Sequence, residues 1–156
     1  MANKKPRRAI RRKPGDVLLI GLDNGESAFG RVLPSPLVAF YDAKSPPDLS
    51  VEEITQRPIL FKIWVMDHAI KDGIWKIIGH VPLTEDLLAE PTFFKKDPIT
   101  GALTLYRDSN GQEIPASRSD CEGLECAAVW DVRHVVDRLV DHFAGRKNAW
   151  VESMRP

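Results

Sequence analysis

A single apolar stripe at helical spacing, near the end of the chain, most restricts how this sequence can fold. The stripe consists of Val132, Val135, Val136, Leu139, Val140 and Phe143. The steps between these residues are three, one, three, one and three, which is the period of one helix face. Asp131 stands at the expected N-cap, and Gly145 at the expected left-handed stop. A helix with one apolar face must cover another apolar surface, which the preceding residues have to supply.

The first third of the chain predicts a β-hairpin. Val17 to Leu22 is a branched apolar run, and Ala28 to Leu33 is its return strand. Asn24-Gly25 between them is typical of a type I′ turn, which needs two residues that tolerate positive φ. Gly30 inside the return strand predicts a bulge or a close approach of another backbone.

Further strand patterns complete the apolar surface. Ile59 to Met66 is the strongest strand pattern and is expected at the centre of the sheet, with Trp75 to Val81 as its hairpin partner after a turn at Asp72-Gly73. Another helix is expected from Ser119 or Asp120 through Val129. Strands first and helices last predict an α+β fold, with a strongly twisted antiparallel sheet beneath the C-terminal amphipathic helix. A partly open barrel is one form that such a sheet can take.

The net charge of zero hides an uneven distribution. Seven of the 22 basic residues precede Asp16, and no acidic residue does. Residues 14–156 therefore carry 15 basic and 22 acidic residues, a net charge of −7. We expect residues 1–13 to form a basic, disordered tail and residues 14–156 to form one α+β domain.

The basic tail leaves a nucleic-acid-binding module open as an alternative function. Its cations are Lys4, Lys5, Arg7, Arg8, Arg11, Arg12 and Lys13. Such a module would bind DNA or RNA through phosphate contacts and would lose binding at high salt. The acidic domain makes nucleic acid the less favoured partner, because it attracts basic proteins instead.

The location of the protein is predicted from what the chain lacks. The two cysteines, Cys121 and Cys126, cannot form a disulfide framework, so free thiols in a reducing compartment are expected. No apolar run approaches the roughly 18 residues that span a bilayer. We therefore expect a cytoplasmic protein without a membrane contact.

Few residue groups in the sequence have the pattern of an active site. Cys121 and Cys126 lack a metal-binding spacing, and His134, Asp137 and Asp141 are expected on a solvated helix face that also carries Arg133 and Arg138. Asp67, His68 and His80 are left as a possible acid–base group, which would make the protein an enzyme. Phosphate-loop, nucleophile-elbow and metalloprotease motifs are all absent. We expect no catalytic residue, no metal and no cofactor.

Several long motifs resemble one protein family. They are Lys13 to Val17, Phe29 to Val32, Val38 to Asp42, Pro58 to Asp67, Ile78 to Leu83, Glu122 to Asp131, His134-Val135, Asp137 to Leu139, Asp141 to Gly145 and Asn148 to Glu152. Together they resemble the Immunity protein 26 family of bacterial polymorphic toxin systems, over nearly everything after the basic tail. The basic cluster departs from the family's opening.

The resemblance implies an antitoxin that binds a cognate toxin domain and occludes its active site. A basic nuclease is the toxin class that an acidic domain suits best. The resemblance supplies no toxin-contact residue, so the predicted contacts come from the sequence alone. They are the acidic residues around the proline-rich loop, Asp42, Asp48, Glu52 and Glu53. The sequence does not indicate an oligomeric state.

Overall fold

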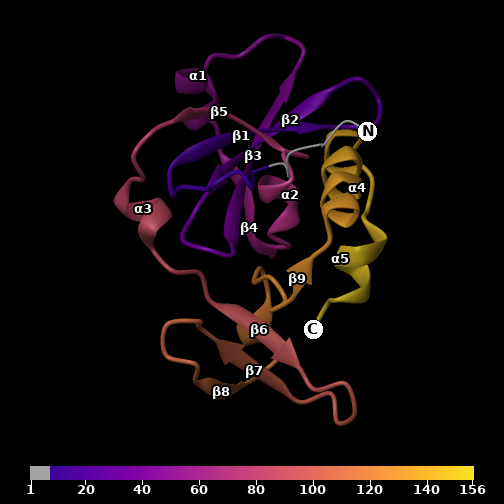
Figure 1. The fold of residues 1–156 in the computed structure, drawn as a ribbon. Helices are drawn as coiled ribbons and strands as arrows, with labels where there is room; N and C mark the ends of the chain where they lie inside the picture. The colour runs from indigo at the N-terminus through magenta and orange to yellow at the C-terminus, as the bar shows by residue number, and fades with distance from the viewer. Residues whose placement is uncertain (1–7) are drawn as a thin grey trace, which may run out of the picture.

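The computed structural model describes residues 8–156, which form nine strands in two sheets and five helices (Figure 1). The larger sheet has the strand order β5-β1-β2-β3-β4-β9. Its strands are β1 (Asp16–Gly21), β2 (Ser27–Val32), β3 (Leu37–Ser45), β4 (Ile59–Val65), β5 (Lys76–His80) and β9 (Val129–Trp130). The α+β prediction is confirmed. The larger sheet stays open, with β5 and β9 as its edges, so it forms no closed barrel.

The first hairpin forms as predicted, but its turn type differs. β1 and β2 pair antiparallel from Val17–Arg31 to Gly21–Ser27. Gly25 has a φ of +82°, and within residues 8–156 every residue with a positive φ is a glycine. The type I′ prediction, which needs positive φ at Asn24 as well, is therefore wrong. Leu22 N–H donates to Glu26 O (2.8 Å), which fits a three-residue loop with glycine at its left-handed position.

Gly30 has the close contact predicted for it. The register of β2 against β3 shifts between Ala28 and Gly30, which marks a bulge. A Cβ on Gly30 would lie 3.3 Å from Ala39 O and 3.4 Å from a side-chain carbon of Ile20. The absence of a side chain thus lets β2 lie close to the Ala39 carbonyl of β3 at the bulge.

The strand pairings further along the chain depart from prediction. β5 pairs antiparallel with β1 instead of forming a hairpin with β4, and β4 lies next to the edge, where it pairs parallel with β9. Helix α2 (His68–Lys71) separates β4 from β5. Its residues Ala69 and Ile70, with Trp75 after it, are buried in the core, so the chain crosses one face of the sheet and joins the far edge.

Helix α4 (Val132–Phe143) covers that same face (Figure 1). Val135 and Leu139 are fully buried and belong to one cluster with Leu18, Phe40 and Ile63 of the sheet. The predicted stripe is thus confirmed as the contact surface. Asp131 accepts a hydrogen bond from Arg133 N–H (2.9 Å), and Gly145 has a φ of +69°, so both predicted helix ends are confirmed.

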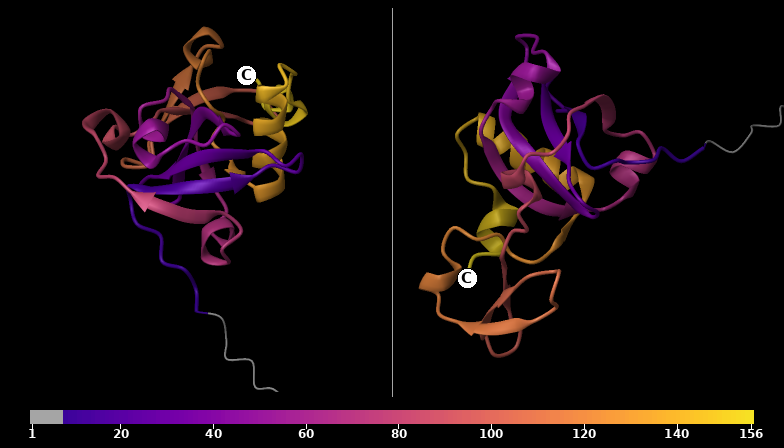
Figure 2. Two further views of the ribbon diagram at one scale, coloured as in Figure 1. Left: turned by 90° about the horizontal axis from the view of Figure 1, so that it is seen from above. Right: turned by 90° about the vertical axis from the view of Figure 1, so that its left-hand side faces the viewer.

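The opposite face of the sheet carries α1 (Val51–Thr55), α3 (Glu85–Leu88) and the smaller sheet. Ser50 caps α1, because its side-chain oxygen accepts from Glu53 N–H (3.2 Å). The smaller sheet consists of β6 (Phe93–Lys96), β7 (Leu103–Tyr106) and β8 (Glu113–Ala116), and it projects away from the larger one (Figure 2). Trp64 of β4 joins the two, with its ring centroid 4.5 Å from that of Phe93.

The prediction of a helix between Ser119 and Val129 is wrong. Only a short 3₁₀ turn, Ser119–Cys121, forms there, and the chain then runs extended into β9. Gly123, with a φ of +75°, interrupts any helix at that point. The last helix, α5 (Ala149–Ser153), is capped by Asn148, which accepts from Val151 N–H (3.0 Å). Within residues 8–156, every helix is too short or too polar to cross a lipid bilayer.

Removal of the α4 cap should weaken the domain measurably. We expect Asp131→Ala to lower the free energy of unfolding by about 1 kcal/mol, because one N–H of the first turn loses its acceptor. Asp137→Ala, on the exposed side of the same helix, is the matched control and should change it little. Urea denaturation followed by circular dichroism measures both. Equal losses for the two variants would show that the cap contributes nothing.

Candidate functional site

A buried arginine organises a polar cluster at one end of the larger sheet. Arg31 on β2 is only 2% exposed. Its Nε donates to Gly15 O (2.9 Å), and its Nη1 donates to Tyr41 Oη (2.9 Å). Its Nη2 donates to the carbonyls of Val81 and Pro82, the latter at 3.1 Å. Within residues 8–156 Arg31 makes no ion pair, so carbonyl and hydroxyl dipoles solvate its charge.

Asp16 and His80 form the second part of this cluster. Asp16 Oδ1 lies 2.9 Å from His80 Nδ1, and Asp16 Oδ2 accepts from Lys13 N–H (2.9 Å). The Asp16 side chain is 8% exposed and that of His80 is 45% exposed. Gly15 lies against the His80 ring, where a Cβ would be only 2.8 Å from the imidazole carbon Cε1. The cluster ties the start of β1 to the end of β5.

The polar cluster has the properties of a structural network. Every nitrogen of the Arg31 guanidinium already has an acceptor, and the buried Asp16 carboxylate receives two contacts. Sequence reasoning missed Arg31 as an individual residue. The signal for it was a basic residue within the apolar strand around Phe29 and Val32, a position where a charged side chain must find partners inside the protein.

The acid–base group predicted from Asp67, His68 and His80 does not assemble. Asp67 pairs with Lys71 (2.8 Å) and Arg12 (3.5 Å), and these contacts, led by the hydrogen bond from Lys71, hold the pKa of Asp67 below its usual range. His80 faces Asp16 instead. His68 is exposed at the start of α2. The grouping is therefore wrong, because β5 lies at the far edge of the sheet and not beside β4.

The polar face of α4 contains no metal centre. His134 stacks on Trp150 with ring centroids 3.7 Å apart, while Asp141 binds Arg146 (3.1 Å) and Asn148 (2.9 Å). No group of three or more His, Cys, Asp or Glu side chains among residues 8–156 has a geometry that holds a metal ion. Asp137 is exposed.

Neither cysteine has the character of an activated nucleophile. Cys121 is buried, and Cys126 is half-buried. Burial raises the pKa of both thiols, and the neighbouring carboxylates Asp120 and Glu125 raise them further. A raised pKa lowers the thiolate fraction at neutral pH.

The four acidic residues predicted to contact a partner lie at separate places in the structure. Asp42 Oδ1 lies 3.0 Å from His142 Nε2 of α4. Glu52 and Glu53 are exposed on the first turn of α1, which packs on the opposite face of the sheet, and Asp48 is exposed in the loop before it. Asp42 thus lies beside α4, whereas the other three lie on α1 or in the loop before it. Their role in binding stays a prediction.

The basic residues predicted to bind nucleic acid also differ among themselves. Lys4, Lys5 and Arg7 lie outside the described residues, while Arg8, Arg11 and Lys13 are exposed.

Arg12 takes part in the fold and is not a free tail cation. Its side chain is 11% exposed, and its Nη2 donates to Leu37 O (2.9 Å) and Leu33 O (3.3 Å). Burial lowers the pKa of Arg12. Ile10 N–H also donates to Lys71 O (3.1 Å), so the segment before β1 contacts the domain at two points. Whether residues 1–13 form a separate unit stays a prediction.

A groove of about 760 Å³ lies where the two sheets meet. Leu60 and Phe61 of β4, Phe93 of β6, residues 121–125 and Val151 of α5 contribute to its walls. Arg138 of α4, predicted on the solvated helix face, instead lies over Phe61, with its guanidinium carbon 3.6 Å from the ring centroid. Arg138 also donates to Glu125.

Comparison with known proteins identifies the family. The family model of Immunity protein 26 matches residues 13–102, which is more than half of the 156 residues. Comparisons with curated proteins and with solved structures gave no match. The matched range contains Gly15, Asp16, Arg31 and His80 of the polar cluster, whereas the motifs after Glu122 lie beyond it. The chain therefore belongs to the Immunity protein 26 family.

Proposed function

We propose that this protein binds a cognate polymorphic toxin domain and neutralises it by occluding the toxin's active site. The family match carries this proposal. The polar cluster agrees with a structural role, because the Arg31 and Asp16 side chains bind carbonyl, hydroxyl, main-chain N–H and imidazole groups of the protein itself. An interface of about 800 Å² on each partner is enough for such a complex.

The charge of the domain favours a basic toxin. Residues 14–156 carry a net charge of −7, which steers a basic partner towards them. Hydrogen bonds hold the pKa values of Asp86 and Glu90 below their usual range, mainly from Thr84 and Ser109 respectively. These exposed carboxylates therefore stay ionised at neutral pH. A nuclease with a basic nucleic-acid groove is the toxin class that this surface suits best.

Co-expression tests the function directly. The protein should restore growth to cells that express the toxin domain encoded next to its gene, and the two chains should elute together in size-exclusion chromatography. An unrelated toxin domain of similar charge is the specificity control. Continued growth arrest together with separate elution would refute the proposal.

The predicted acidic contacts can be tested in the same complex. Asp48→Lys, Glu52→Lys and Glu53→Lys together should slow association with the toxin about tenfold or more and weaken its salt dependence, since rim charges act mainly on the association rate. The triple variant Asp72→Lys, Glu85→Lys and Asp137→Lys, at exposed acidic residues away from α1, is the matched control. If both variants associate equally fast, the toxin does not approach over α1.

A further inference from the structure

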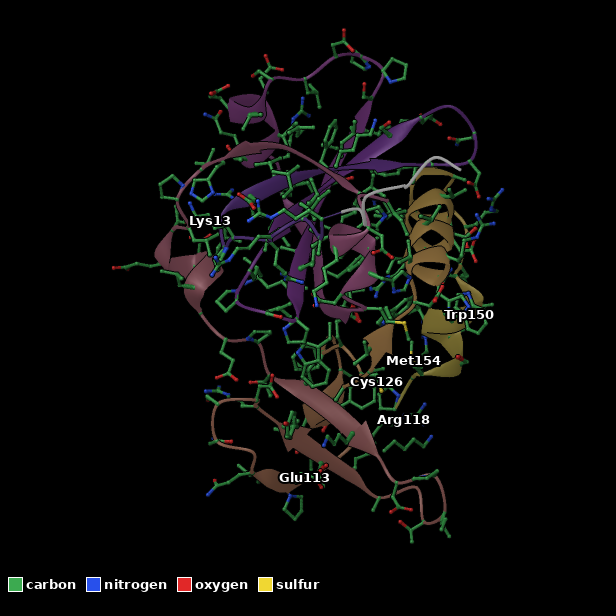
Figure 3. All side chains as sticks on the ribbon, in the orientation of Figure 1. Lys13, Glu113, Arg118, Cys126, Trp150 and Met154 are labelled. Atoms are coloured by element: carbon green, nitrogen blue, oxygen red, sulfur yellow. The ribbon has the colours of Figure 1, made fainter. Side chains whose placement is uncertain are left out.

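The groove between the two sheets is locally basic in an otherwise acidic domain. Its lining includes four basic side chains and two acidic ones. The basic residues are Lys62, Arg118, Arg138 and Arg155, and the acidic residues are Glu122 and Glu125. In the view of Figure 3, Arg118 lies between the smaller sheet and the C-terminal helix, and it lines the groove together with Val151 and Arg155. The groove therefore has the opposite charge from the domain that surrounds it.

The four cations differ in how far their charge is already neutralised. Arg138 pairs with Glu125, and Arg155 pairs with Glu152 (2.8 Å). Lys62 Nζ donates to the main-chain oxygen of Asp86 (3.1 Å), and Arg118 forms no ion pair with any of residues 8–156. Arg118 and Arg155 are exposed, so both can reach an incoming group.

Arg138 supplies a fixed cation in this groove. Its guanidinium carbon lies 3.6 Å from the ring centroid of Phe61 and 5.1 Å from that of Trp130, and its side chain is only 13% exposed. Nη1 is buried and has no hydrogen-bond partner within residues 8–156. A guanidinium held between aromatic rings keeps its planar donors oriented for a carboxylate.

The remaining walls are apolar. Leu60, Phe93, Leu124 and Val151 line the groove beside the cations. Apolar walls with a few cations suit the aliphatic stem and carboxylate head of a glutamate, or a short segment that contains acidic residues. A nucleic-acid strand suits it less, because a strand needs a continuous row of cations for successive phosphates, and acidic surface surrounds this groove.

We propose that the groove binds an acidic segment of the toxin domain and holds one of its carboxylates on Arg118 and Arg155, beside the Arg138–Glu125 pair. This inference rests on the proposed function and adds a second contact of opposite charge to the acidic surface. A toxin bound in this way would present both a basic surface and a carboxylate. These two contacts of opposite charge fix one orientation of the complex and weaken the binding of partners that lack the acidic segment.

The groove can first be tested with a simple acidic probe. A hexaglutamate peptide should shift the arginine side-chain NMR signals of Arg118, Arg138 and Arg155 in the full chain, and a hexaglutamine peptide should not. Arg118→Glu combined with Arg155→Glu should abolish the shift of the remaining Arg138 signal, whereas the control pair Lys76→Glu with Lys147→Glu, both exposed, should retain the shifts of all three arginines. A shift of Arg57 as large as that of Arg118 would overturn the inference. Larger shifts with oligothymidine or inorganic phosphate than with the peptide would overturn it as well.

The toxin complex separates this inference from the proposed function. Arg118→Glu with Arg155→Glu should weaken toxin binding at least about tenfold, as expected for a lost charge-assisted contact, while the control pair Lys76→Glu with Lys147→Glu, exposed and away from both α1 and the groove, leaves it unchanged. If the wild-type complex forms and the double variant binds as tightly, the groove assignment fails and the antitoxin function stands. If the wild-type complex does not form, the function itself fails.

Discussion

Arg31→Met should lower the free energy of unfolding by about 3–5 kcal/mol, one of the largest losses that a single substitution in this domain can cause. Methionine fills much of the space but donates no hydrogen bond. The carbonyl of Gly15 and the hydroxyl of Tyr41 would each lose a buried donor, as would the carbonyls of Val81 and Pro82 at the margin of the cluster. Tyr41 Oη would lose its donor away from water, Gly15 O would keep only the Val81 N–H, and the lost charge-assisted bonds add to the loss. Urea denaturation of the purified variant measures it.

Three further variants define what Arg31 contributes. Arg31→Lys should recover only a small part of the loss, because an ammonium cannot reach acceptors on several sides of a planar guanidinium. Tyr41→Phe removes one acceptor and should cost about 1 kcal/mol. Arg57→Met, at an exposed arginine, should change stability little. If Arg31→Met were as stable as the wild type, the cluster would not hold the sheet together.

The expected loss at Arg31 indicates that the family motifs around it serve the fold. Gly15, Asp16, Arg31 and His80 all lie within the residues that the family model matches, and all belong to the same cluster. The motifs around them describe how β1, β2 and β5 are joined. Residues that select a particular toxin are therefore expected elsewhere, on surfaces such as α1 and the groove. The groove residues Arg118, Arg138 and Arg155 lie beyond the matched range, whereas α1 lies within it.

Local chemistry explains which parts of the fold were predictable. The α4 stripe, its Asp131 cap and its Gly145 stop all lie within fifteen residues and depend on nothing else in the chain. The hairpin of β1 and β2 is equally local. Even there, the turn type was wrong, because the loop has three residues and needs positive φ only at Gly25.

Contacts between distant residues explain the failures. The pairing of β5 with β1 joins residues about sixty positions apart, and the sequence pattern of neither strand indicates which strand it pairs with. Arg138 was placed in solvent because helical spacing puts it beside the exposed residues. Its stacking on Phe61 depends on where β4 passes. The polar cluster and the groove could not be assembled from sequence for the same reason, since each combines side chains from several elements.

Gly15→Ala should be nearly as destabilising as the loss of Arg31, with a cost of about 3 kcal/mol or more. Gly15 has a φ of +103°, and an added Cβ would lie 2.7 Å from Val81 O and 2.8 Å from the His80 ring. Neither neighbour is free to move. Val81 N–H donates to Gly15 O (3.1 Å), and the His80 ring is held by Asp16. The substitution must therefore push β1 away from the end of β5 and pull Gly15 O away from Arg31.

Gly25→Ala distinguishes two causes of this loss, the backbone strain at a positive φ and the close contacts of the added Cβ. Gly25 also has a positive φ, +82°, but a Cβ there would meet no atom within 4 Å. Its cost should be the backbone strain alone, about 1–2 kcal/mol. Equal losses at the two glycines would mean that the contact with Val81 and His80 contributes nothing.

The double variant Gly15→Ala with Arg31→Met provides the final test. Both changes break the same contacts, so together they should cost clearly less than the sum of the two, whereas full additivity would show that Gly15 and Arg31 act independently.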